Sequence, residues 1–500
     1  MRLLGDISRL NARRFGDEIA IFFDDARLTF RDLDGGADAI ARRLQDSGVA
    51  VGERVAILAE NCLEYLPIYF GIVKIGAVCV PLNFRCVLEE LEHMMRDSGA
   101  RVLFYMPNNW EQAKELAKRS GGEIQLVEIG GYLLAPTSGP LDPPPAPLDE
   151  NSAATIMYTS GTTGVPKGAV LPHRSLIETS SAIALAAGIR HSDRVIITVP
   201  LFHGGGLYVV GHSHLYVGAS LVITRKFVPG ELLDLIERHG ATTFFGVAAQ
   251  YTMLLDVIQK DRVTPSRLRN GWYGGAPMPV ELVKRSQQLW PTVRFQQLYG
   301  QTETTVVTVL SAEDHDARIG SAGREIPNVE MRVVDEEGVD CQTGVVGEII
   351  VHQDAGMLGY FNNPQQTAAA IRDGWIYTGD LGFLDERRFV TIVDRKRDVI
   401  LSGGENIYPK EIEEVLYAHG SVLEAAVIGV LDPKWGEIPM AFVVTRRDTE
   451  QSMELLRSWC ETRLARYKIP RRWHFVPELP KTANGKIQKQ LLRDIARNLG

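Results

Sequence analysis

The sequence has no cysteine pattern that would support a disulfide framework or a zinc site. It contains five cysteines in 500 residues, an odd number without a CxxC pair. They are scattered along the chain at Cys62, Cys79, Cys86, Cys341 and Cys460. Dispersed thiols of this kind are typical of a reducing compartment. We therefore expect a cytoplasmic protein.

Long apolar runs and clusters of positive charge are also missing. In the N-terminal segment MRLLGDISRLNARRFGDEIA, charges interrupt every apolar run, which excludes a secretory signal and a transmembrane segment there. The chain has 54 Lys and Arg against 62 Asp and Glu, a net charge of −8, without a long Lys/Arg run. This balance gives no support for a nucleic-acid partner.

What the sequence does contain predicts more than one domain, because 500 residues exceed what one core usually organises. Short apolar strands such as RVAILAE and ARVLFY alternate with helical segments, which predicts a largely parallel α/β sheet. Thr29, with Asp32 three residues on, is typical of a helix cap. The proline-rich residues 138–151 indicate an exposed connector.

The pattern of apolar and turn-forming residues changes after about residue 323. The segment VEMRVVDEEGVDCQTGVVGEIIV has acidic and glycine turns between apolar runs, which indicates a smaller antiparallel or barrel-like unit. About one hundred residues of mixed helix and strand follow Asp394, and Pro409 is well placed to begin a helix there. That tail is long enough to form its own domain.

The segment YTSGTTGVPKGA, residues 158–169, carries the strongest chemical signal. Its glycines let backbone N–H groups converge, its hydroxyls add donors, and Lys167 supplies a cation for phosphate oxygens. Alone, such a composition is usually a solvated loop. A Walker P-loop requires Gly-Lys followed by Ser or Thr, whereas Pro166 precedes Lys167 and Gly168 follows it. The order of residues excludes the Walker loop.

Six further segments follow this loop: PLFHGGG, YGGAPMP, QLYGQTET, GWIYTGDLG, VDRKRDVILSGGENIYPKEIE and PKTANGKI. The whole set resembles the adenylate-forming superfamily of acyl-CoA synthetases, adenylation domains and beetle luciferases, over roughly residues 10–490. It looks most like bacterial fatty-acyl-CoA and aryl-CoA ligases. The resemblance implies an α/β fold. Residues 1–396 would form a large N-terminal domain of stacked α/β sheets plus a small barrel-like subdomain, and residues 397–500 a small mobile α+β domain.

The resemblance also implies a two-step reaction. A carboxylate attacks the α-phosphate of ATP and pyrophosphate leaves; the thiol of coenzyme A then attacks the acyl-adenylate and AMP leaves. The cofactors would be ATP, Mg²⁺ and coenzyme A, the last as a co-substrate. The partner would be a small-molecule carboxylic acid, and a homodimer is left open as a possibility. Both steps crowd negative charge near phosphorus, so cations and preorganised donors should contribute most to catalysis.

By resemblance, three groups of residues bind the nucleotide. The phosphate group comprises Thr159, Ser160, Gly161, Thr162, Thr163, Gly164 and Lys167. The adenine-side loop comprises Gly274, Gly275, Ala276 and Pro277. The next motif supplies Tyr299, Gly300, Gln301, Thr302 and Glu303. Tyr299 would stack on adenine with space left beside it by Gly300, and Glu303, with Thr159, would be catalytic and associate with magnesium. Asp380 resembles the carboxylate that accepts both ribose hydroxyls, and Arg395 its companion.

Lys486 in TANGKI resembles the catalytic lysine that bridges the substrate carboxylate and the α-phosphate. Without this resemblance, a lysine after Asn-Gly is usually a residue of a tight turn with no catalytic role. Arg397 stands at the hinge position, where relatives usually carry Asp or Lys. The resemblance implies that the small domain rotates there after adenylation. Gly403, Gly404 and Asn406 would then meet the pantetheine arm of coenzyme A.

His203 is expected beside the carboxylate and phosphate as a further catalytic residue, although a lone histidine in an apolar stretch is more often a core residue. His212 and His214 hint at a metal site but lack a further ligand cluster. The resemblance places the acyl pocket at His203, Gly205, Val209, Phe245, Gly246, Val306 and Val307.

These pocket positions are small or apolar, and burying an unpaired phenol hydroxyl there would cost about 1–3 kcal/mol. No arginine follows the histidine motif to hold a second carboxylate. We therefore expect an AMP-forming acyl-CoA synthetase for a medium- or long-chain fatty acid. The alternatives are an aryl- or hydroxycinnamate-CoA ligase and an enzyme that loads a carrier protein. A luciferase-like oxygenase and a non-catalytic binding relative are weaker alternatives.

Overall fold

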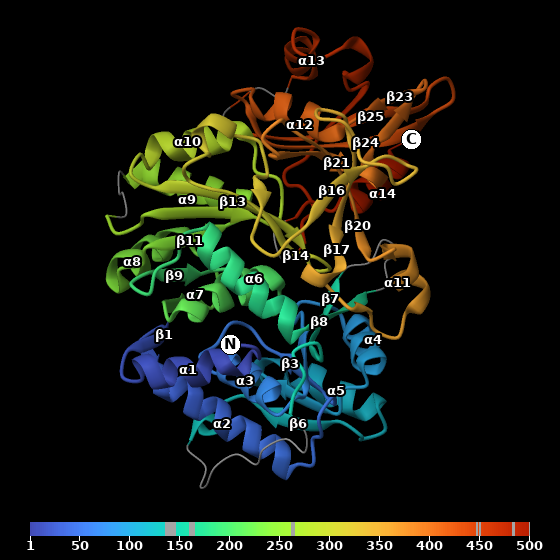
Figure 1. The fold of residues 1–500 in the computed structure, drawn as a ribbon. Helices are drawn as coiled ribbons and strands as arrows, with labels where there is room; N and C mark the ends of the chain where they lie inside the picture. Colours follow the sequence, from blue (N-terminus) through green and yellow to red (C-terminus); the bar gives the residue numbers. More distant parts are fainter. Residues whose placement is uncertain are drawn as a thin grey trace.

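The computed structural model describes residues 1–135, 147–159, 166–261, 266–446, 449, 452–482 and 486–499. Within these ranges the strands form four sheets, and helices cover them (Figure 1). The helices are α1 (Gly5–Phe15), α2 (Phe30–Asp46), α3 (Tyr65–Lys74), α4 (Leu88–Ser98), α5 (Trp110–Arg119), α6 (His173–Ala186), α7 (Ser213–Val217), α8 (Pro229–His239), α9 (Ala248–Asp261), α10 (Val280–Leu289), α11 (Pro364–Ala370), α12 (Pro409–Tyr417), α13 (Met453–Glu461) and α14 (Lys489–Asn498).

Two large sheets make up most of the N-terminal part. The first has the order β15 (Arg324–Glu325), β14 (Thr305–Leu310), β13 (Arg294–Gln301), β12 (Asn270–Gly274), β11 (Thr243–Gly246), β9 (Arg194–Ile197), β10 (Ser220–Ile223), β1 (Ile19–Phe23) and β2 (Ala26–Thr29). The second has the order β18 (Gly359–Tyr360), β8 (Lys167–Pro172), β7 (Ala153–Thr159), β4 (Val78–Leu82), β3 (Arg54–Leu58), β5 (Val102–Tyr105) and β6 (Gln125–Glu128).

The strands in the middle of both sheets pair in parallel, as the alternation of strands and helices predicted, whereas β13 with β14 and β7 with β8 pair antiparallel. The predicted cap of α2 is confirmed, because the Thr29 side chain accepts from the Asp32 N–H and the Asp32 carboxylate accepts from the Thr29 N–H. One apolar core extends through both sheets; Ile57, Leu221 and Phe245 all belong to it. Most of the proline-rich connector lies outside the described residues.

The two smaller sheets follow in chain order. The third contains β16 (Met331–Val334), β17 (Gly347–His352), β20 (Trp375–Leu384), β19 (Ile371–Arg372) and, paired to β20, β21 (Val390–Arg395). All of its pairings are antiparallel, as predicted. The fourth contains β23 (Glu405–Ile407), β22 (Ile400–Ser402), β25 (Gly436–Thr445), β24 (Val422–Asp432) and, paired to β25, β26 (Arg472–Phe475).

The fourth sheet has its own core, which includes Ile412 and Val427, and α12 begins at Pro409 as expected. A single 3₁₀ turn, Lys396–Asp398, joins this unit to β21, and Arg397 lies in that turn. The turn therefore lies at the expected boundary between residues 396 and 397. Across the described ranges, no helix is long and apolar enough to span a membrane.

Candidate active site

Asp380 is held by three donors from neighbouring strands. The Tyr299 hydroxyl donates to its Oδ2 over 2.8 Å, Gln301 Nε2 donates to the same oxygen over 2.7 Å, and Arg395 Nε lies 2.7 Å from Oδ1. The residue is 3 % exposed. A carboxylate offers about four acceptor positions, so the protein leaves about one of them free. To accept two ribose hydroxyls, Asp380 would have to release one of these donors.

The glycines near Tyr299 do not all leave open space. A Cβ on Gly300 would lie 1.8 Å from the carbonyl oxygen of Thr305, and one on Gly274 would lie 2.3 Å from that of Leu298. Gly300 therefore permits the close approach of β13 and β14, which corrects the expectation that it opens room for adenine. Gly275 differs, because its φ is 75° and a Cβ added there would meet no atom within 4 Å, so this turn has open space beside it.

Glu303 is positioned at the end of β13 through its backbone and its side chain. The N–H of Met357 donates to its carbonyl oxygen over 2.8 Å, and the hydroxyl of Tyr360 donates to its Oε1 over 2.8 Å. A Cβ on Gly356 would lie 2.5 Å from the Glu303 carbonyl oxygen, so the segment can approach this closely only because it carries a glycine.

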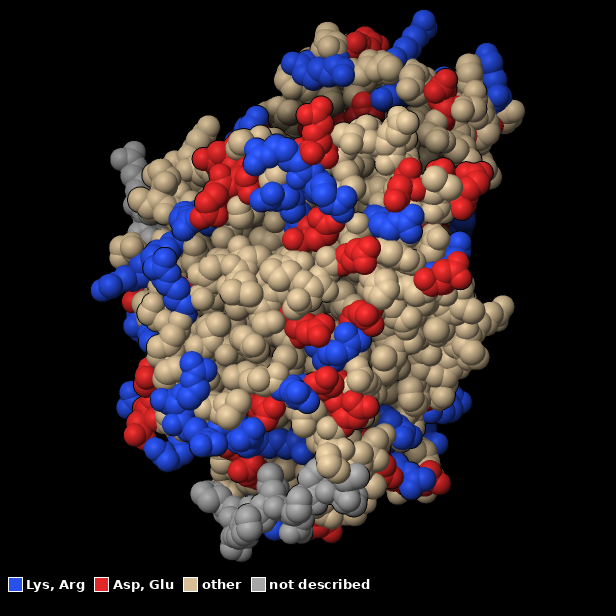
Figure 2. Space-filling model, viewed as in Figure 1, with Lys and Arg blue, Asp and Glu red and all other residues tan. Residues whose placement is uncertain are grey.

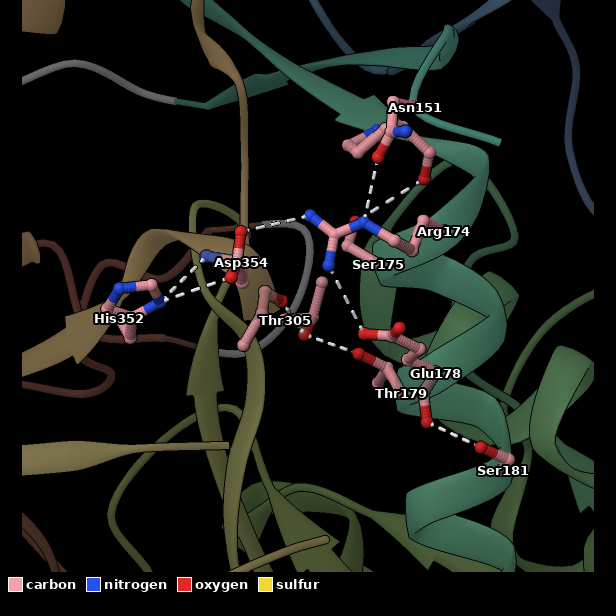
Figure 3. Close-up of polar contacts among 11 residues, drawn as sticks. Asn151, Arg174, Ser175, Glu178, Thr179, Ser181, Thr305, His352 and Asp354 are labelled. Atoms are coloured by element: carbon pink, nitrogen blue, oxygen red, sulfur yellow. Dashed lines mark hydrogen bonds and ion pairs between the residues drawn. The ribbon is translucent and has the colours of Figure 1, made fainter. Parts of the chain in front are cut away.

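Thr305, two residues later, holds a left-handed backbone with a φ of 57°. Its hydroxyl lies 2.6 Å from that of Thr179 on α6 and 3.1 Å from the carbonyl oxygen of Ala355, to which it can donate (Figure 3). A positive φ is costly for a β-branched residue and persists where surrounding contacts determine it. The turn after Glu303 is therefore fixed by contacts from α6 and from the segment after β17.

A second set of contacts ties that segment to α6. Arg174 donates to the side chains of Asn151 over 2.9 Å and of Asp354 over 3.2 Å, and forms an ion pair with Glu178 at 3.6 Å (Figure 3). Arg174 thus joins the start of α6 to the residues just before Ala355. No sequence pattern indicated this arrangement, because its members belong to three separate segments.

The ends of the expected phosphate loop lie side by side. Thr159 on β7 pairs with Lys167 on antiparallel β8, so the two residues close a hairpin loop. The intervening candidates Ser160, Gly161, Thr162, Thr163 and Gly164 lie outside the described residues. Lys167 Nζ donates to Gln366 Oε1 over 2.7 Å and lies 5.5 Å from the centre of the Tyr360 ring. Lys167 and Glu303 therefore share a neighbour.

His203 lies at the start of the π-helix Gly205–His212, and burial lowers its pKa to about 4, with a smaller contribution from Lys486. The ring is therefore neutral near pH 7. The N–H of Gly205 donates to its Nδ1 over 3.1 Å. Since a backbone N–H can only donate, the proton of the neutral ring resides on Nε2. His203 consequently presents a hydrogen-bond donor on the side away from Gly205.

Lys486 reaches the same region from the C-terminal unit. Burial lowers its pKa to about 8, and the neighbouring charges that act on it include Arg395 and Asp380. Its backbone N–H donates to the Thr482 hydroxyl over 3.2 Å, which closes a small hairpin. Lys486 thus lies near enough to His203 and to Asp380 for their charges to interact, although the three residues are far apart in the sequence.

The expected acyl lining is only partly assembled. Phe245 and Val306 belong to the core shared by the two large sheets, with Val209 against it, and a Cβ on Gly205 would lie 3.8 Å from the Phe245 ring. Val307 is a correction: it lies on the other face of β14 in the core of the antiparallel unit, because successive strand residues point to opposite faces.

Gly246 contributes backbone only. A Cβ there would lie 2.6 Å from the ring of Phe244, which belongs to a separate apolar core together with Tyr251. The glycine is thus required by packing behind the strand, and the position adds no side chain to the lining.

The expected coenzyme A residues lie elsewhere. Gly403, Gly404 and Asn406 are exposed on the β22–β23 hairpin, and the N–H of Gly403 donates to the Trp435 carbonyl over 2.8 Å. Among the described residues, no hydrogen bond or ion pair links them to Glu303, Asp380 or Lys486.

Magnesium fits the residues present. The described residues contain no group of three or more His, Cys, Asp and Glu side chains that could hold a metal ion. Mg²⁺ usually takes one or two carboxylates together with phosphate oxygens and water, so it does not need such a group. Glu303 suits this role, since Tyr360 engages Oε1 and, within the described part of the chain, Oε2 has no partner. His212 and His214 are buried in the core, so they offer no such site.

The charged side chains show no surface of a single sign on the face drawn in Figure 2. Lys and Arg lie among Asp and Glu around a broad area without charge. This mixture of signs agrees with the similar numbers of basic and acidic residues in the sequence.

The comparisons define the class of protein. The family described as AMP-binding enzyme matches residues 9–361, and its C-terminal domain matches residues 411–486. The chain is 36 % identical to the feruloyl-CoA synthase of Amycolatopsis sp, covering 98 % of each, and 37 % identical to the fatty acid–[acyl-carrier-protein] ligase ScoC of Streptomyces coeruleorubidus, covering 95 % and 93 %. The chain therefore belongs to the AMP-binding enzyme family.

Solved structures agree. The ATP-bound MatB from Rhodopseudomonas palustris has a TM-score of 0.90 at 31 % identity, covering 98 % of this chain and 99 % of that one. The anthranilate CoA ligase AuaEII with anthranoyl-AMP has a TM-score of 0.93 at 29 % identity, covering 99 % and 97 %. The protein is an AMP-forming acid–CoA ligase that uses ATP, Mg²⁺ and coenzyme A.

Proposed function

We propose that this ligase activates an apolar monocarboxylic acid in the cytoplasm, with a medium- or long-chain fatty acid as the first candidate. The supporting observation is the apolar environment of His203: a Cβ on Gly205 would lie 3.4 Å from its Nδ1 and 3.8 Å from the Phe245 ring, and Phe245 belongs to the same apolar core as Val306. A carboxylate bound at His203 would extend its chain along these residues. An acid with a second charge would lose hydration there without a partner.

In the first half-reaction we assign the developing charge to three groups of this chain. The carboxylate oxygen bonds to the α-phosphorus while the bond from that phosphorus to the β-phosphate oxygen breaks and pyrophosphate leaves. Lys486 and the Nε2–H of His203 would stabilise the oxygens at the reacting phosphorus. Lys167, at the end of the phosphate loop, would hold the departing pyrophosphate.

Magnesium would neutralise phosphate charge while it is held by Glu303 and the phosphate oxygens. Asp380 and Arg395 would fix the ribose. These roles follow from the resemblance and from the placement of the side chains, and variants can test each of them separately.

The direct test measures pyrophosphate release from ATP and then the dependence of thioester formation on coenzyme A. The acids tested range from acetate to oleate and include substituted cinnamates. We expect the highest kcat/KM with an unsubstituted acid of about eight or more carbons, on the order of a thousandfold above acetate, because each buried methylene contributes about 0.8 kcal/mol. Activity that rises with added charge or polarity on the acid would refute the fatty-acid assignment.

An aryl acid is the second candidate, and one buried side chain favours it. Tyr208 on the π-helix is 3 % exposed, and Thr155 is the polar side chain beside its hydroxyl. The Tyr208 ring would lie 3.4 Å from a Cβ on Gly204, next to His203. A phenol hydroxyl could pair there. A preference for ferulate over cinnamate that Tyr208→Phe abolishes would establish this alternative.

The half-reactions also separate ligases from carrier-loading enzymes. Thioester formed on free coenzyme A supports the proposal, whereas thioester formed only on an acyl-carrier protein would place the chain with the carrier-loading relatives. Lys486→Ala should abolish adenylation and spare thioester formation from preformed acyl-adenylate. Equal loss of both steps would contradict the role given to Lys486.

A further inference from the structure

Tyr360 links two residues that the motifs place in different parts of the site. It lies on β18, which pairs with β8 just beyond Lys167. Its hydroxyl donates to Glu303 Oε1 over 2.8 Å, and its ring centre lies 5.5 Å from Lys167 Nζ.

The surrounding residues hold Tyr360 in place. Its backbone N–H donates to the hydroxyl of Thr367, within α11, over 2.9 Å. Gln366, the residue before, accepts from Lys167 Nζ over 2.7 Å. The segment from Tyr360 to Thr367 therefore contacts both the Lys167 ammonium and the Glu303 carboxylate.

Lys167 and Glu303 carry opposite charges, which attract each other. The described residues include no ion pair between Lys167 and Glu303, although both flank the Tyr360 side chain. A direct pair would neutralise the ammonium needed by phosphate and the carboxylate needed by a metal ion. The Tyr360 hydroxyl and Gln366 each give one of these groups a neutral partner.

We propose that Tyr360 is a positioning residue that keeps Glu303 and Lys167 apart and available, the carboxylate for Mg²⁺ and the ammonium for the leaving phosphates. The proposal rests on the roles given above to Glu303 and Lys167. It adds a residue from a segment that none of the recognised motifs includes. Its effect is confined to the first half-reaction, because the second does not involve pyrophosphate.

The test compares one substitution that affects the contact with Glu303 and one that affects the contact with Lys167. Tyr360→Phe keeps the ring beside Lys167 and removes only the hydroxyl. We expect the Mg²⁺ concentration for half-maximal pyrophosphate release to rise about tenfold, because a hydrogen bond to a charged group is lost. Gln366→Met should raise the KM for ATP and leave the Mg²⁺ dependence unchanged. Thioester formation from preformed acyl-adenylate should stay at the wild-type rate in both variants.

A binding measurement separates this proposal from the proposed function. Calorimetric titration of ATP at several Mg²⁺ concentrations requires no acid substrate, and the Tyr360→Phe variant should show the same shift in Mg²⁺ dependence. Tyr132→Phe is a matched control, since that hydroxyl donates to the Glu128 carbonyl in an exposed turn. Wild-type Mg²⁺ dependence in Tyr360→Phe, or equal loss in both half-reactions, would overturn the proposal. A wild-type protein that binds Mg²⁺ and ATP yet activates no acid would refute only the function.

Discussion

Asp380 and Arg395 face each other across β20 and β21, and Arg395 Nε lies 2.7 Å from Asp380 Oδ1. This pair places a cation beside the buried carboxylate expected at the ribose. It also brings Arg395 close enough to Lys486 that its charge, after the larger effect of burial, lowers the pKa of that lysine. One arginine therefore pairs with Asp380 and also acts on Lys486.

Arg395→Gln should weaken ATP binding. The glutamine retains one donor but loses the charge, and a hydrogen bond to a charged group contributes about 1.5–3 kcal/mol. We expect the KM for ATP to rise about 10- to 100-fold, measured by pyrophosphate release. Arg372→Gln is the control, because Arg372 stacks on the Tyr377 ring at an exposed site. An unchanged KM for ATP in Arg395→Gln would contradict the role of the pair.

Adenylation should decrease as the pH rises through about 8. A lysine is charged below its pKa, and burial lowers the pKa of Lys486 to about 8. The charge that stabilises the transition state is therefore present below that pH and lost above it. Rates of pyrophosphate release between about pH 6 and pH 10 at saturating ATP measure the effect.

In Arg395→Gln the adenylation rate should fall at a higher pH than in wild type, because the charge of Arg395 adds to burial in lowering the pKa of Lys486. In Lys486→Arg any residual activity should lack this fall, because a guanidinium stays charged. An alkaline limb at the same pH in wild type and in both variants would assign it to another group.

His203 should act as a neutral donor through Nε2. Because burial lowers its pKa to about 4, no acid limb from this ring is expected near neutral pH. His203→Gln can place an amide N–H near the position of Nε2, whereas the shorter Asn cannot reach it. We expect His203→Gln to retain more adenylation activity than His203→Asn, by about tenfold. The reverse order would show that the Nδ1 side faces the substrate.

Thr305 should tolerate glycine better than valine. Its φ of 57° costs an L-residue with a side chain about 1–2 kcal/mol, which its hydrogen bonds offset. Thr305→Val keeps the strain and loses the hydroxyl, so its free energy of unfolding should fall by about 1–3 kcal/mol. Thr305→Gly loses the hydroxyl but removes the strain. Thermal midpoints should rank wild type first, glycine second and valine last; a valine variant as stable as wild type would contradict this account.

Glu414 on α12 should hold the C-terminal unit in the arrangement that brings Lys486 to the site. Its carboxylate accepts from the N–H of Val280, the first residue of α10, over 3.1 Å. A carboxylate at a helix N-terminus is stabilised by the orphan N–H groups and the helix dipole.

Glu414→Gln should therefore lower adenylation about threefold to tenfold without slowing thioester formation from preformed acyl-adenylate. Glu411→Gln on the same helix is the control, because Glu411 pairs with Lys468 inside the C-terminal unit. If both half-reactions fall together in Glu414→Gln, the contact supports folding and does not select one arrangement.

Features that depend on neighbours in the chain were predictable. The alternation of strands and helices, the Thr29 cap of α2 and the helix start at Pro409 all follow from local backbone and side-chain geometry. The order of the motifs also indicated the family and most nucleotide-side candidates, because each motif is a short continuous loop with its own chemistry.

Features that depend on the packing of separate elements were not predictable. The sequence placed Val306 and Val307 together, whereas the strand turns them to opposite cores. It assigned the space beside Gly300 to adenine, whereas the Thr305 carbonyl occupies it. Side-chain direction and strand-to-strand distance are set by pairing partners, which a motif does not contain.

The sequence by itself determined the α/β fold, the order of the loops and the chemistry that each loop can offer. Only the tertiary structure decided which distant groups interact: Tyr360 donates to Glu303, 57 residues away, and the charge of Lys486 acts on His203 from the C-terminal unit. The reason is physical. Local preferences fix the conformation of a segment, whereas contact between distant side chains depends on how the sheets and the C-terminal unit bury their apolar faces against one another.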